Sequence, residues 1–274
     1  MNFYHFLPYY ISPVIFSIGG FAVRWYSVMY LVAFAVVYFL LAQRIRKGEG
    51  NYNKDLIFDY FVYAIVGLLI GARLGYVFFY NFSYYLQNPL QIIFPQSVSN
   101  GVSGMSYYGG LIGIILATIF FTKKNKINFW KFADFIIPAI PAGYFFGRIG
   151  NFLNGELYGR ATNSWIGMYF PLAVGNADLH SLRYPSQLFE AFFEGIILFI
   201  ILWFLRNRLK FSGYLSSIYL FGYGFFRFFI EFFREPDPQI GFIFGFLTLG
   251  QIFSLALIVA AAIIYLRNSK QTLK

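Results

Sequence analysis

Three arginines, Arg73, Arg148 and Arg227, lie inside long apolar runs of this sequence. A charged side chain at the centre of a bilayer costs at least about 2.5–3.5 kcal/mol, so an arginine retained there is by default a candidate for function. The planar guanidinium group donates paired hydrogen bonds to a phosphate or a carboxylate, a geometry that lysine does not reproduce. The three positions therefore predict a site for an anionic group within the membrane.

The apolar runs that carry these arginines belong to a series of about seven. The chain is 59% hydrophobic and only 12% charged, whereas a soluble domain has roughly 25% charged residues. A helix needs roughly 20 residues to cross a bilayer, and apolar runs of that length form helices because lipid offers the backbone no hydrogen bonds. We predict an all-α, polytopic membrane protein with about seven transmembrane helices, namely Trp25–Ala42, Leu56–Tyr80, Met105–Thr122, Phe132–Phe152, Leu188–Leu205, Gly213–Phe233 and Phe242–Leu266.

The basic residues of the loops predict the orientation, because Lys and Arg gather on the cytoplasmic side of membrane proteins. The loop after the second predicted span, residues 81–104, has no Lys or Arg. We therefore expect the N-terminus outside and the C-terminus in the cytoplasm, and the loops explain the net charge of +10 without a nucleic-acid partner. The basic residues of alternate loops and the tail are Arg44, Arg46, Lys47, Lys54, Lys123, Lys124, Lys126, Lys131, Arg206, Arg208, Lys210, Arg267, Lys270 and Lys274.

The rest of the chain is expected to belong to the same single integral membrane domain, residues 1–274. Residues 1–21 and 82–104 are rich in apolar side chains and contain prolines, so we expect them to be outer interfacial arms or loops. Residues 157–187 form the longest outer connection and are expected to be a small head. With no cysteine and only His5 and His180, we expect no metal site and no cofactor.

The arginines share one expected depth. Arg227 is 14 residues from Gly213, where its span begins, which is about 21 Å along a helix and in the outer half of a roughly 30 Å hydrocarbon core. The same reckoning places Arg73 and Arg148 in the outer half, with Tyr26 and Tyr108 near the outer ends of their spans. This convergence predicts one site at the depth of the outer leaflet.

Other polar groups surround two of these arginines. Tyr223, Arg227 and Glu231 recur at every fourth residue, which makes a polar stripe on one helix face. The segment Gly147–Glu156 places asparagines, glycines and a glutamate around Arg148. Structural readings remain open for several of these residues, because Arg227 and Glu231 could form a self-neutralising ion pair.

Further alternatives concern Arg73 and two glutamates. Arg73 could extend to the outer headgroups, and Glu190 and Glu194 could support the arginines or lie at an interface between helices. A small-residue face, which favours close helix packing, is formed by Gly67, Gly71 and Gly75.

The segment GRIGNFLNGELYGR, Gly147–Arg160, closely resembles the signature of the prolipoprotein diacylglyceryl transferase family. The resemblance covers nearly the whole chain. Its other blocks, in order, are ISPVIFSIG (Ile11–Gly19), the pairs Trp25-Tyr26 and Met29-Tyr30, GARLGYVFFYNF (Gly71–Phe82), MSYYGGLIG (Met105–Gly113), YPSQLFE (Tyr184–Glu190) and GYGFFRFFIEFFREPD (Gly222–Asp237).

The resemblance implies a reaction and its partners. The family transfers the diacylglyceryl group of phosphatidylglycerol to the thiol of the lipobox cysteine in a prolipoprotein signal peptide. A thioether forms and glycerol phosphate leaves. The resemblance also implies a bacterial cytoplasmic (inner) membrane, with the active site toward the outer leaflet.

Family positions that match this sequence imply the site residues. As catalytic residues these matches imply Arg148, Arg227, Glu156 and Glu231, and we add Tyr108, which stands where the family usually has another residue. For binding of phosphatidylglycerol we expect Arg148, Tyr26, Asn151, Asn154, Gly159, Tyr223 and Arg73. Arg234 also matches a family arginine. Because negative charge grows on the leaving phosphate, Arg148 and Arg227 are expected to stabilise the transition state, and a strongly positive site would favour the substrate thiolate.

Two blocks depart from the family pattern. The family usually has His-Gly-Gly where this chain has Tyr108-Gly109-Gly110, and His-Pro-Ser-Gln where it has Tyr184-Pro185-Ser186-Gln187. A phenol is a poor base at neutral pH, so we expect Tyr108 to position substrate. The thiol proton then goes to Glu156 or Glu231, or the thiolate is captured without a dedicated base.

Two other classes compete with this reading. A transporter or channel with an Arg-lined anion or lipid site would be expected to show inverted repeats, and the sequence shows no repeat. A Mg²⁺-dependent lipid-headgroup transferase would need clustered carboxylates, whereas the acidic residues here are scattered along the chain.

Overall fold

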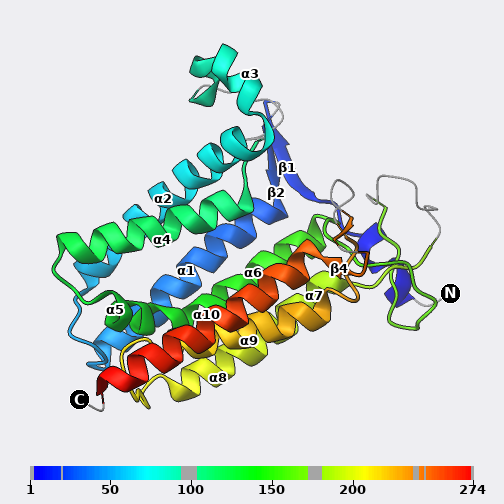
Figure 1. Ribbon diagram of the computed structural model, residues 1–274. Coiled ribbons are helices and arrows are strands. Elements are labelled where there is room, and N and C mark those ends of the chain that lie inside the picture. Colours follow the sequence, from blue (N-terminus) through cyan, green and yellow to red (C-terminus); the bar gives the residue numbers. More distant parts are fainter. Residues whose placement is uncertain are drawn as a thin grey trace. The chain divides into compact units, whose positions relative to one another are not determined.

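The computed structural model describes residues 3–19, 21–93, 104–171, 181–236, 241–243 and 245–272. The described part is mostly helical (Figure 1). The chain divides into two compact units, a larger one of Met1–Leu41 with Ala133–Lys274 and a smaller one of Ala42–Phe132.

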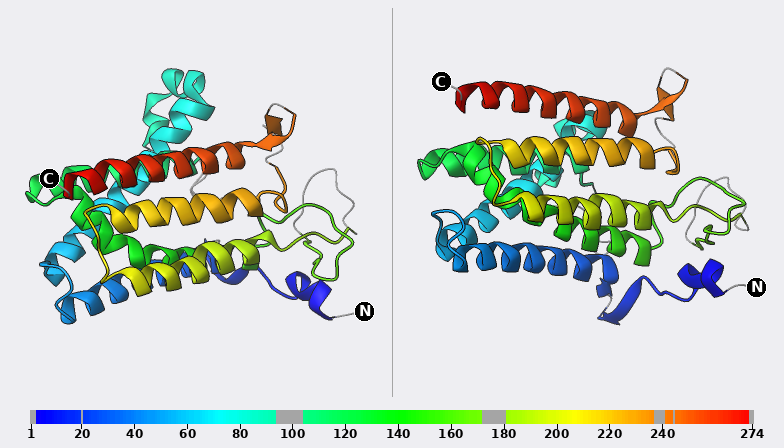
Figure 2. Two further views of the ribbon diagram at one scale, coloured as in Figure 1. Left: turned by 60° about the horizontal axis from the view of Figure 1, so that its bottom comes forward. Right: turned by 90° about the horizontal axis from the view of Figure 1, so that it is seen from below.

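The larger unit consists of helices that run side by side, as α6, α8, α9 and α10 do in both views of Figure 2. Its first helix, α1, continues into the smaller unit. The elements are η1 (Phe3–Tyr9), β1 (Val14–Ile18), β2 (Phe21–Arg24), α1 (Trp25–Arg46), η3 (Ile137–Ala139), α6 (Ile140–Leu153), α7 (Ser186–Glu190), η4 (Ala191–Ile197), α8 (Leu198–Leu205), α9 (Tyr214–Ile230), β3 (Phe242–Ile243), β4 (Leu247–Thr248) and α10 (Leu249–Thr272).

The start of α9 is fixed by a buried carboxylate. Asp134 accepts hydrogen bonds from the backbone N–H of Gly213 at 2.7 Å, and from the N–H and the hydroxyl of Ser216 at 2.9 and 2.8 Å. An anion at a helix N-terminus satisfies backbone donors that have no partner inside the helix. Since α9 carries Arg227, this cap helps to set the register of the site.

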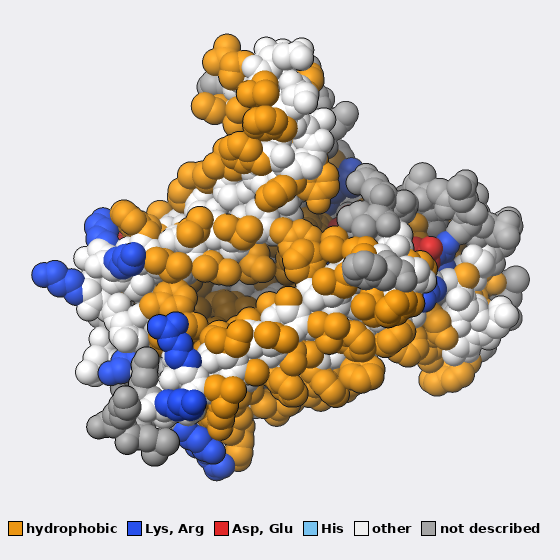
Figure 3. All heavy atoms as spheres, viewed as in Figure 1, with side chains coloured by type: hydrophobic (Ala, Val, Ile, Leu, Met, Phe, Trp, Pro, Cys, Tyr) orange, Lys and Arg blue, Asp and Glu red, His pale blue; other side chains and the backbone are white. Residues whose placement is uncertain are grey.

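The outer sides of the helices are apolar. Leu31 on α1, Phe204 on α8 and Ile263 on α10 are 69%, 64% and 59% exposed, and Figure 3 shows hydrophobic side chains covering much of the helix surface. Among the described residues, four helices are long and apolar enough to cross a membrane, namely Trp25–Arg46, Lys54–Tyr80, Ser186–Leu205 and Leu249–Lys270. The chain is therefore a multi-pass membrane protein.

The other three predicted spans also fall on helix. They coincide with α4 (Tyr107–Lys124), with α5 (Phe129–Ile136) continued through η3 into α6, and with α9. These helices are shorter, more polar or interrupted, as at Pro138 in η3. The count of seven spans therefore stays a prediction.

The predicted last span is wrong at its start. Helix was predicted from Phe242, but β3 and β4 pair as an antiparallel hairpin and α10 begins only at Leu249. Gly241 and Gly245 have positive φ angles of 62° and 80°, a conformation that glycine adopts without a steric penalty. The apolar composition of the hairpin is indistinguishable from that of a helix end, which explains the error.

In their described parts, the predicted arms and the predicted head contain short helices, short strands and isolated bridges. Residues 1–21 hold η1 and the strand β1, which pairs antiparallel with β2. Residues 82–104 hold the short helices α3 (Phe82–Gln87) and η2 (Pro89–Ile92) in their described part. In residues 157–187, isolated bridges join Ala161 and Met168 to Arg183. The part of this head that spans 172–180, with His180, lies outside the described residues.

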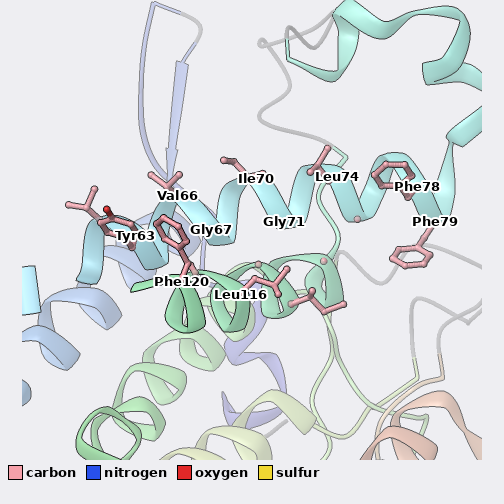
Figure 4. Close-up of a pocket in the computed structure, with 16 residues that line it drawn as sticks. Tyr63, Val66, Gly67, Ile70, Gly71, Leu74, Phe78, Phe79, Leu116 and Phe120 are labelled. Atoms are coloured by element: carbon pink, nitrogen blue, oxygen red, sulfur yellow. The ribbon is translucent and has the colours of Figure 1, made fainter. Parts of the chain in front are cut away.

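The smaller unit is built on close contact between α2 (Lys54–Tyr80) and α4. A methyl group added at Gly71 would lie 2.4 Å from the Gly109 carbonyl oxygen, and one at Gly113 would lie 2.0 Å from that of Gly67. The prediction that the glycine face of the second span packs against another helix is confirmed. Beside this contact the two helices line an apolar groove of about 700 Å³, where Tyr63 and Phe120 lie next to each other (Figure 4).

Candidate active site

Three arginines of the larger unit converge on one buried glutamate. The carboxylate of Glu190 lies 2.7 Å from Nε of Arg148, 2.8 Å from Nη1 of Arg227 and 3.0 Å from Nη1 of Arg234. The Glu190 side chain is 0% exposed, and the three arginine side chains are 12–13% exposed. An internal carboxylate thus occupies a cluster of planar donors suited to a carboxylate or a phosphate.

The fold brings this cluster together from three helices. Glu190 ends α7, Arg148 lies on α6, and Arg227 lies on α9 with Arg234 just beyond its end. Helix α7 lies beside both α6 and α9 (Figure 1). The contacts between α6 and the following η4 are close, because a methyl group at Gly195 would lie 2.8 Å from Cβ of Phe145.

A second carboxylate, that of Glu231, contacts Arg227 through the other terminal nitrogen of the guanidinium group. Glu231 pairs with Nη2 of Arg227 and lies 3.8 Å from Nε of Arg234, while its second oxygen accepts a hydrogen bond from the Thr248 hydroxyl at 2.8 Å. A methyl group at Gly250 would lie 2.5 Å from this carboxylate. The β3–β4 hairpin and the start of α10 therefore close the site around Glu231. The ion pair of Arg227 with Glu231, which the sequence left open as an alternative, is present as part of a larger cluster.

The signature segment extends the network from Arg148. Its Nη1 donates to Oδ1 of Asn151 at 3.2 Å, and Nδ2 of Asn151 donates to Oε1 of Glu156 at 2.8 Å. The backbone carbonyl of Glu156 accepts from Nε2 of Gln187 at 2.6 Å. Oδ1 of Asn154 is buried and has no hydrogen-bond partner among the described residues, so this acceptor is left unused there.

Backbone atoms of neighbouring segments leave no room for a side chain at Gly159. Its N–H donates to the Tyr184 carbonyl at 2.7 Å, and its own carbonyl accepts from Nη1 of Arg183 at 3.1 Å. A methyl group there would lie 2.4 Å from the Phe233 carbonyl oxygen. The structure therefore gives Gly159 a packing role beside Arg234, with which it forms a bridge. Its predicted contact with lipid stays untested.

The predicted tyrosines are divided between the two units. In the larger unit, the Tyr26 hydroxyl donates to that of Tyr30 at 3.0 Å, and the Tyr223 ring meets the Tyr144 ring edge to face with centroids 5.8 Å apart. Tyr108 belongs to the smaller unit, where it is half-buried and packs against the Tyr107 ring. Its role in catalysis remains a prediction.

Arg73 also belongs to the smaller unit, where its guanidinium group is hydrogen-bonded to backbone carbonyls. It donates to the backbone carbonyls of Ile92, Gln91 and Gly104 at 2.9, 2.6 and 3.2 Å. Its guanidinium lies over the Tyr85 ring at 5.2 Å. These contacts hold the segment after α2 in place. They support a structural role, and the predicted lipid contact remains a prediction.

The electrostatics correct one expectation. The sequence suggested a strongly positive site, but Glu190 and Glu231 lie among the three arginines and offset two of their charges. A carboxylate within 3 Å of three guanidiniums also fixes their orientation. The site is better described as preorganised than as strongly positive, and preorganised donors are what stabilise charge that develops in a transition state.

Sequence reasoning left open the residue at the centre of the site. The sequence leaves two roles open for Glu190 and Glu194, support of the arginines or an interface between helices, and it gives no signal for Tyr144. The signal was available, since two carboxylates one turn apart in an apolar run carry the same intramembrane cost as the arginines. Among the described residues, no group of three or more His, Cys, Asp or Glu side chains could hold a metal ion.

The apolar helices and the buried arginine–carboxylate cluster between them place the chain in the class of multi-pass membrane proteins with a charged cluster inside the helix bundle. The sequence model of the prolipoprotein diacylglyceryl transferase family matches residues 13–267. The chain therefore belongs to the prolipoprotein diacylglyceryl transferase family, and the resemblance seen in the sequence is confirmed.

Relatives agree over nearly the full length. The chain is 52% identical over 271 residues to the phosphatidylglycerol–prolipoprotein diacylglyceryl transferase of Chlorobaculum tepidum, covering 97% of this chain and 92% of the relative. It is 48% identical to the protein of that name from Rickettsia bellii, covering 91% and 92%. With the one from Pseudoalteromonas translucida it shares 43% identity over 91% and 90%.

Proposed function

We propose that this protein transfers the diacylglyceryl group of phosphatidylglycerol to a cysteine thiol of a prolipoprotein. Family membership and the relatives' names support this activity, and they give no support to a transporter or channel. The observation that carries the site is the convergence of Arg148, Arg227 and Arg234 on buried Glu190. The acceptor is the lipobox cysteine of the precursor's signal peptide.

In the reaction the thiol sulfur attacks a glycerol carbon of the lipid. A C–S bond forms, the C–O bond to the phosphate breaks with its electron pair, and glycerol phosphate leaves while the thiol loses its proton. Arg148 and Arg227 bind the phosphate and stabilise the charge that grows on it. Tyr26, Asn151, Asn154 and Tyr223 complete the binding site for phosphatidylglycerol, together with Gly159 and Arg73.

The contacts of Glu231 and Glu156 indicate which of the two carboxylates accepts the thiol proton. Glu231 is held by Arg227 and by the Thr248 hydroxyl, so it is committed to positioning. Glu156 is half-buried and accepts a side-chain hydrogen bond from Asn151 through one oxygen. We assign the thiol proton to Glu156, with Tyr108 positioning the lipid or the thiol through its hydroxyl.

The protein lies in the bacterial cytoplasmic membrane as a single integral domain. Seven spans, with the N-terminus outside and the C-terminus in the cytoplasm, place the site toward the outer leaflet, with residues 1–21 and 82–104 as interfacial arms and 157–187 as an outer head. The sequence has no cysteine, so single cysteines report orientation cleanly. Cysteines at Asn125 and Asn207 should react only from the cytoplasmic side and one at Asn163 only from outside. Cytoplasmic labelling at Asn163 would overturn this orientation.

The activity is tested with the purified protein in lipid nanodiscs, acyl-labelled phosphatidylglycerol and a lipobox peptide. The expected result is a diacylglyceryl-modified peptide with one glycerol phosphate released per thioether. A peptide with serine in place of cysteine should stay unmodified, and phosphatidylethanolamine should not replace the donor. Modification of the serine peptide, or none of the cysteine peptide, would contradict the proposal.

A further inference from the structure

Tyr144 on α6 touches both glutamates of the helix that faces it. Its hydroxyl lies 3.3 Å from Oε2 of Glu190 and is also hydrogen-bonded to Oε2 of Glu194. Its ring lies under the Arg148 guanidinium, with 4.7 Å from Cζ to the ring centroid. One side chain thus joins the central carboxylate, a second carboxylate and an arginine of the site.

Counting donors shows that these contacts need one more proton. A phenol carries a single O–H, and an ionised carboxylate only accepts. If both glutamates were ionised, the Tyr144 hydroxyl could donate to one of them and would face the other without a bridging hydrogen. If one carboxyl is protonated, it donates to the Tyr144 oxygen while Tyr144 donates to the other, and both contacts are satisfied.

The surroundings decide which glutamate carries the proton. Glu190 has three guanidiniums within 3.0 Å, so it remains ionised. Glu194 is 1% exposed, takes part in none of the ion pairs among the described residues, and its Oε1 has no hydrogen-bond partner there. The charged and titratable groups that interact with it are Tyr144 and Arg148 of α6, Arg227 of α9, and Glu190 at the end of α7. Burying a carboxylate without a paired cation is costly, whereas the neutral acid is tolerated.

We propose that Glu194 is a neutral carboxylic acid that donates to Tyr144, and that this pair positions Glu190 and, through Glu190, the arginines that receive the phosphate. Glu194 and Tyr144 are positioning residues, since they act through Glu190. With Glu194 neutral, the cluster of Arg148, Arg227 and Arg234 keeps one positive charge beyond those offset by Glu190 and Glu231. The catalytic part of this inference rests on the transferase function proposed above, and the protonation part does not.

The test compares the same isosteric change at two glutamates one helical turn apart. Glu194→Gln replaces a neutral donor by a neutral donor, so kcat should stay within about threefold of the wild type. Glu190→Gln removes the anion that orients three arginines, so kcat should fall roughly hundredfold or more. Tyr144→Phe removes the hydroxyl that links Glu194 to Glu190 but keeps the ring. We therefore expect kcat to fall roughly tenfold while KM for phosphatidylglycerol changes little.

A matched control for Tyr144 is another buried tyrosine. The Tyr60 hydroxyl bonds that of Thr118 at 3.0 Å in the smaller unit, so Tyr60→Phe should leave kcat unchanged. A second readout needs no turnover. Infrared spectra of the protein in H₂O and D₂O should show a protonated carboxylic acid band that disappears in Glu194→Gln and persists in Glu190→Gln.

The outcomes separate the two claims. If the wild type forms no thioether, the proposed function fails, while the infrared band still reports on Glu194. If Glu194→Gln is folded and as inactive as Glu190→Gln, or if the band is unchanged in Glu194→Gln, then Glu194 is an ionised residue and the inference is wrong. Wild-type kcat in Tyr144→Phe would show that the hydroxyl positions nothing.

Discussion

Glu190→Gln is the substitution that most sharply tests the structural logic of the site. Gln has nearly the same shape as Glu but carries no charge, so the change leaves three guanidiniums 2.7–3.0 Å from a neutral amide. Removing one partner of a buried ion pair costs roughly 3–5 kcal/mol, since the remaining charge stays buried without compensation. We expect a free energy of unfolding lower by about that amount.

Glu235→Gln supplies the control. Glu235 also pairs with an arginine, Arg183, at 3.2 Å, but its side chain is 44% exposed. An exposed pair is worth roughly 0–1 kcal/mol, so the same chemical change should be nearly silent there. The free energy of unfolding of both variants would be measured by denaturant titration of the detergent-solubilised protein. The rate of peptide modification would then be measured on the folded protein of each variant.

The transfer rate should separate the variants further. Once Glu190 no longer orients Arg148 and Arg227, we expect the folded Glu190→Gln protein to lose roughly hundredfold or more in kcat. If Glu190→Gln unfolds and turns over like Glu235→Gln, the arginine cluster needs no central anion, and the reasoning from its geometry is refuted.

Three further predictions concern residues expected from the sequence. Arg148→Lys and Arg227→Lys should each lower kcat roughly hundredfold although charge is kept, because lysine lacks the paired donors, whereas Arg160→Lys should be milder; near-normal turnover of both lysine variants would make these arginines structural charges. Tyr108→Phe should lose activity partially and Tyr108→His should retain much of it, and total loss in Tyr108→Phe with rescue by Tyr108→His would identify the hydroxyl as the base. Gly159→Ala should destabilise the protein by about 1–3 kcal/mol, since its methyl group would meet a backbone oxygen at 2.4 Å, and an unchanged unfolding curve would argue against this packing role.

The membrane architecture could be predicted because its signals are local. The apolar runs are continuous in the sequence, and each predicted span overlaps a helix in the structure. The glycine spacing at Gly67 and Gly71 predicted close helix contact, which the short distances to Gly113 and Gly109 confirm. What failed was local too, since the hairpin before α10 is as apolar as the helix that follows it.

The centre of the site could not be derived in the same way. The cost of intramembrane charge singled out Arg148 and Arg227, but it gave no information on which side chains compensate them. That compensation joins α6, α7 and α9 at Glu190, and such pairing depends on tertiary contacts between residues more than 30 positions apart in the chain. The role of Gly159 was likewise hidden, because it arises from backbone atoms of distant segments.

The central claim is that two of the guanidiniums held by Glu190, those of Arg148 and Arg227, bind the phosphate of phosphatidylglycerol. Solid-state NMR can measure the dipolar coupling between the lipid phosphorus and ¹⁵N-labelled arginine side chains, in nanodiscs of phosphatidylcholine with added phosphatidylglycerol. We predict a coupling of hydrogen-bonded strength to the phosphatidylglycerol resonance in the wild type and in Arg160→Lys, and its loss in the double variant of Arg148→Lys and Arg227→Lys. A coupling that is absent from the wild type, or that survives unchanged in the double variant, would contradict the claim.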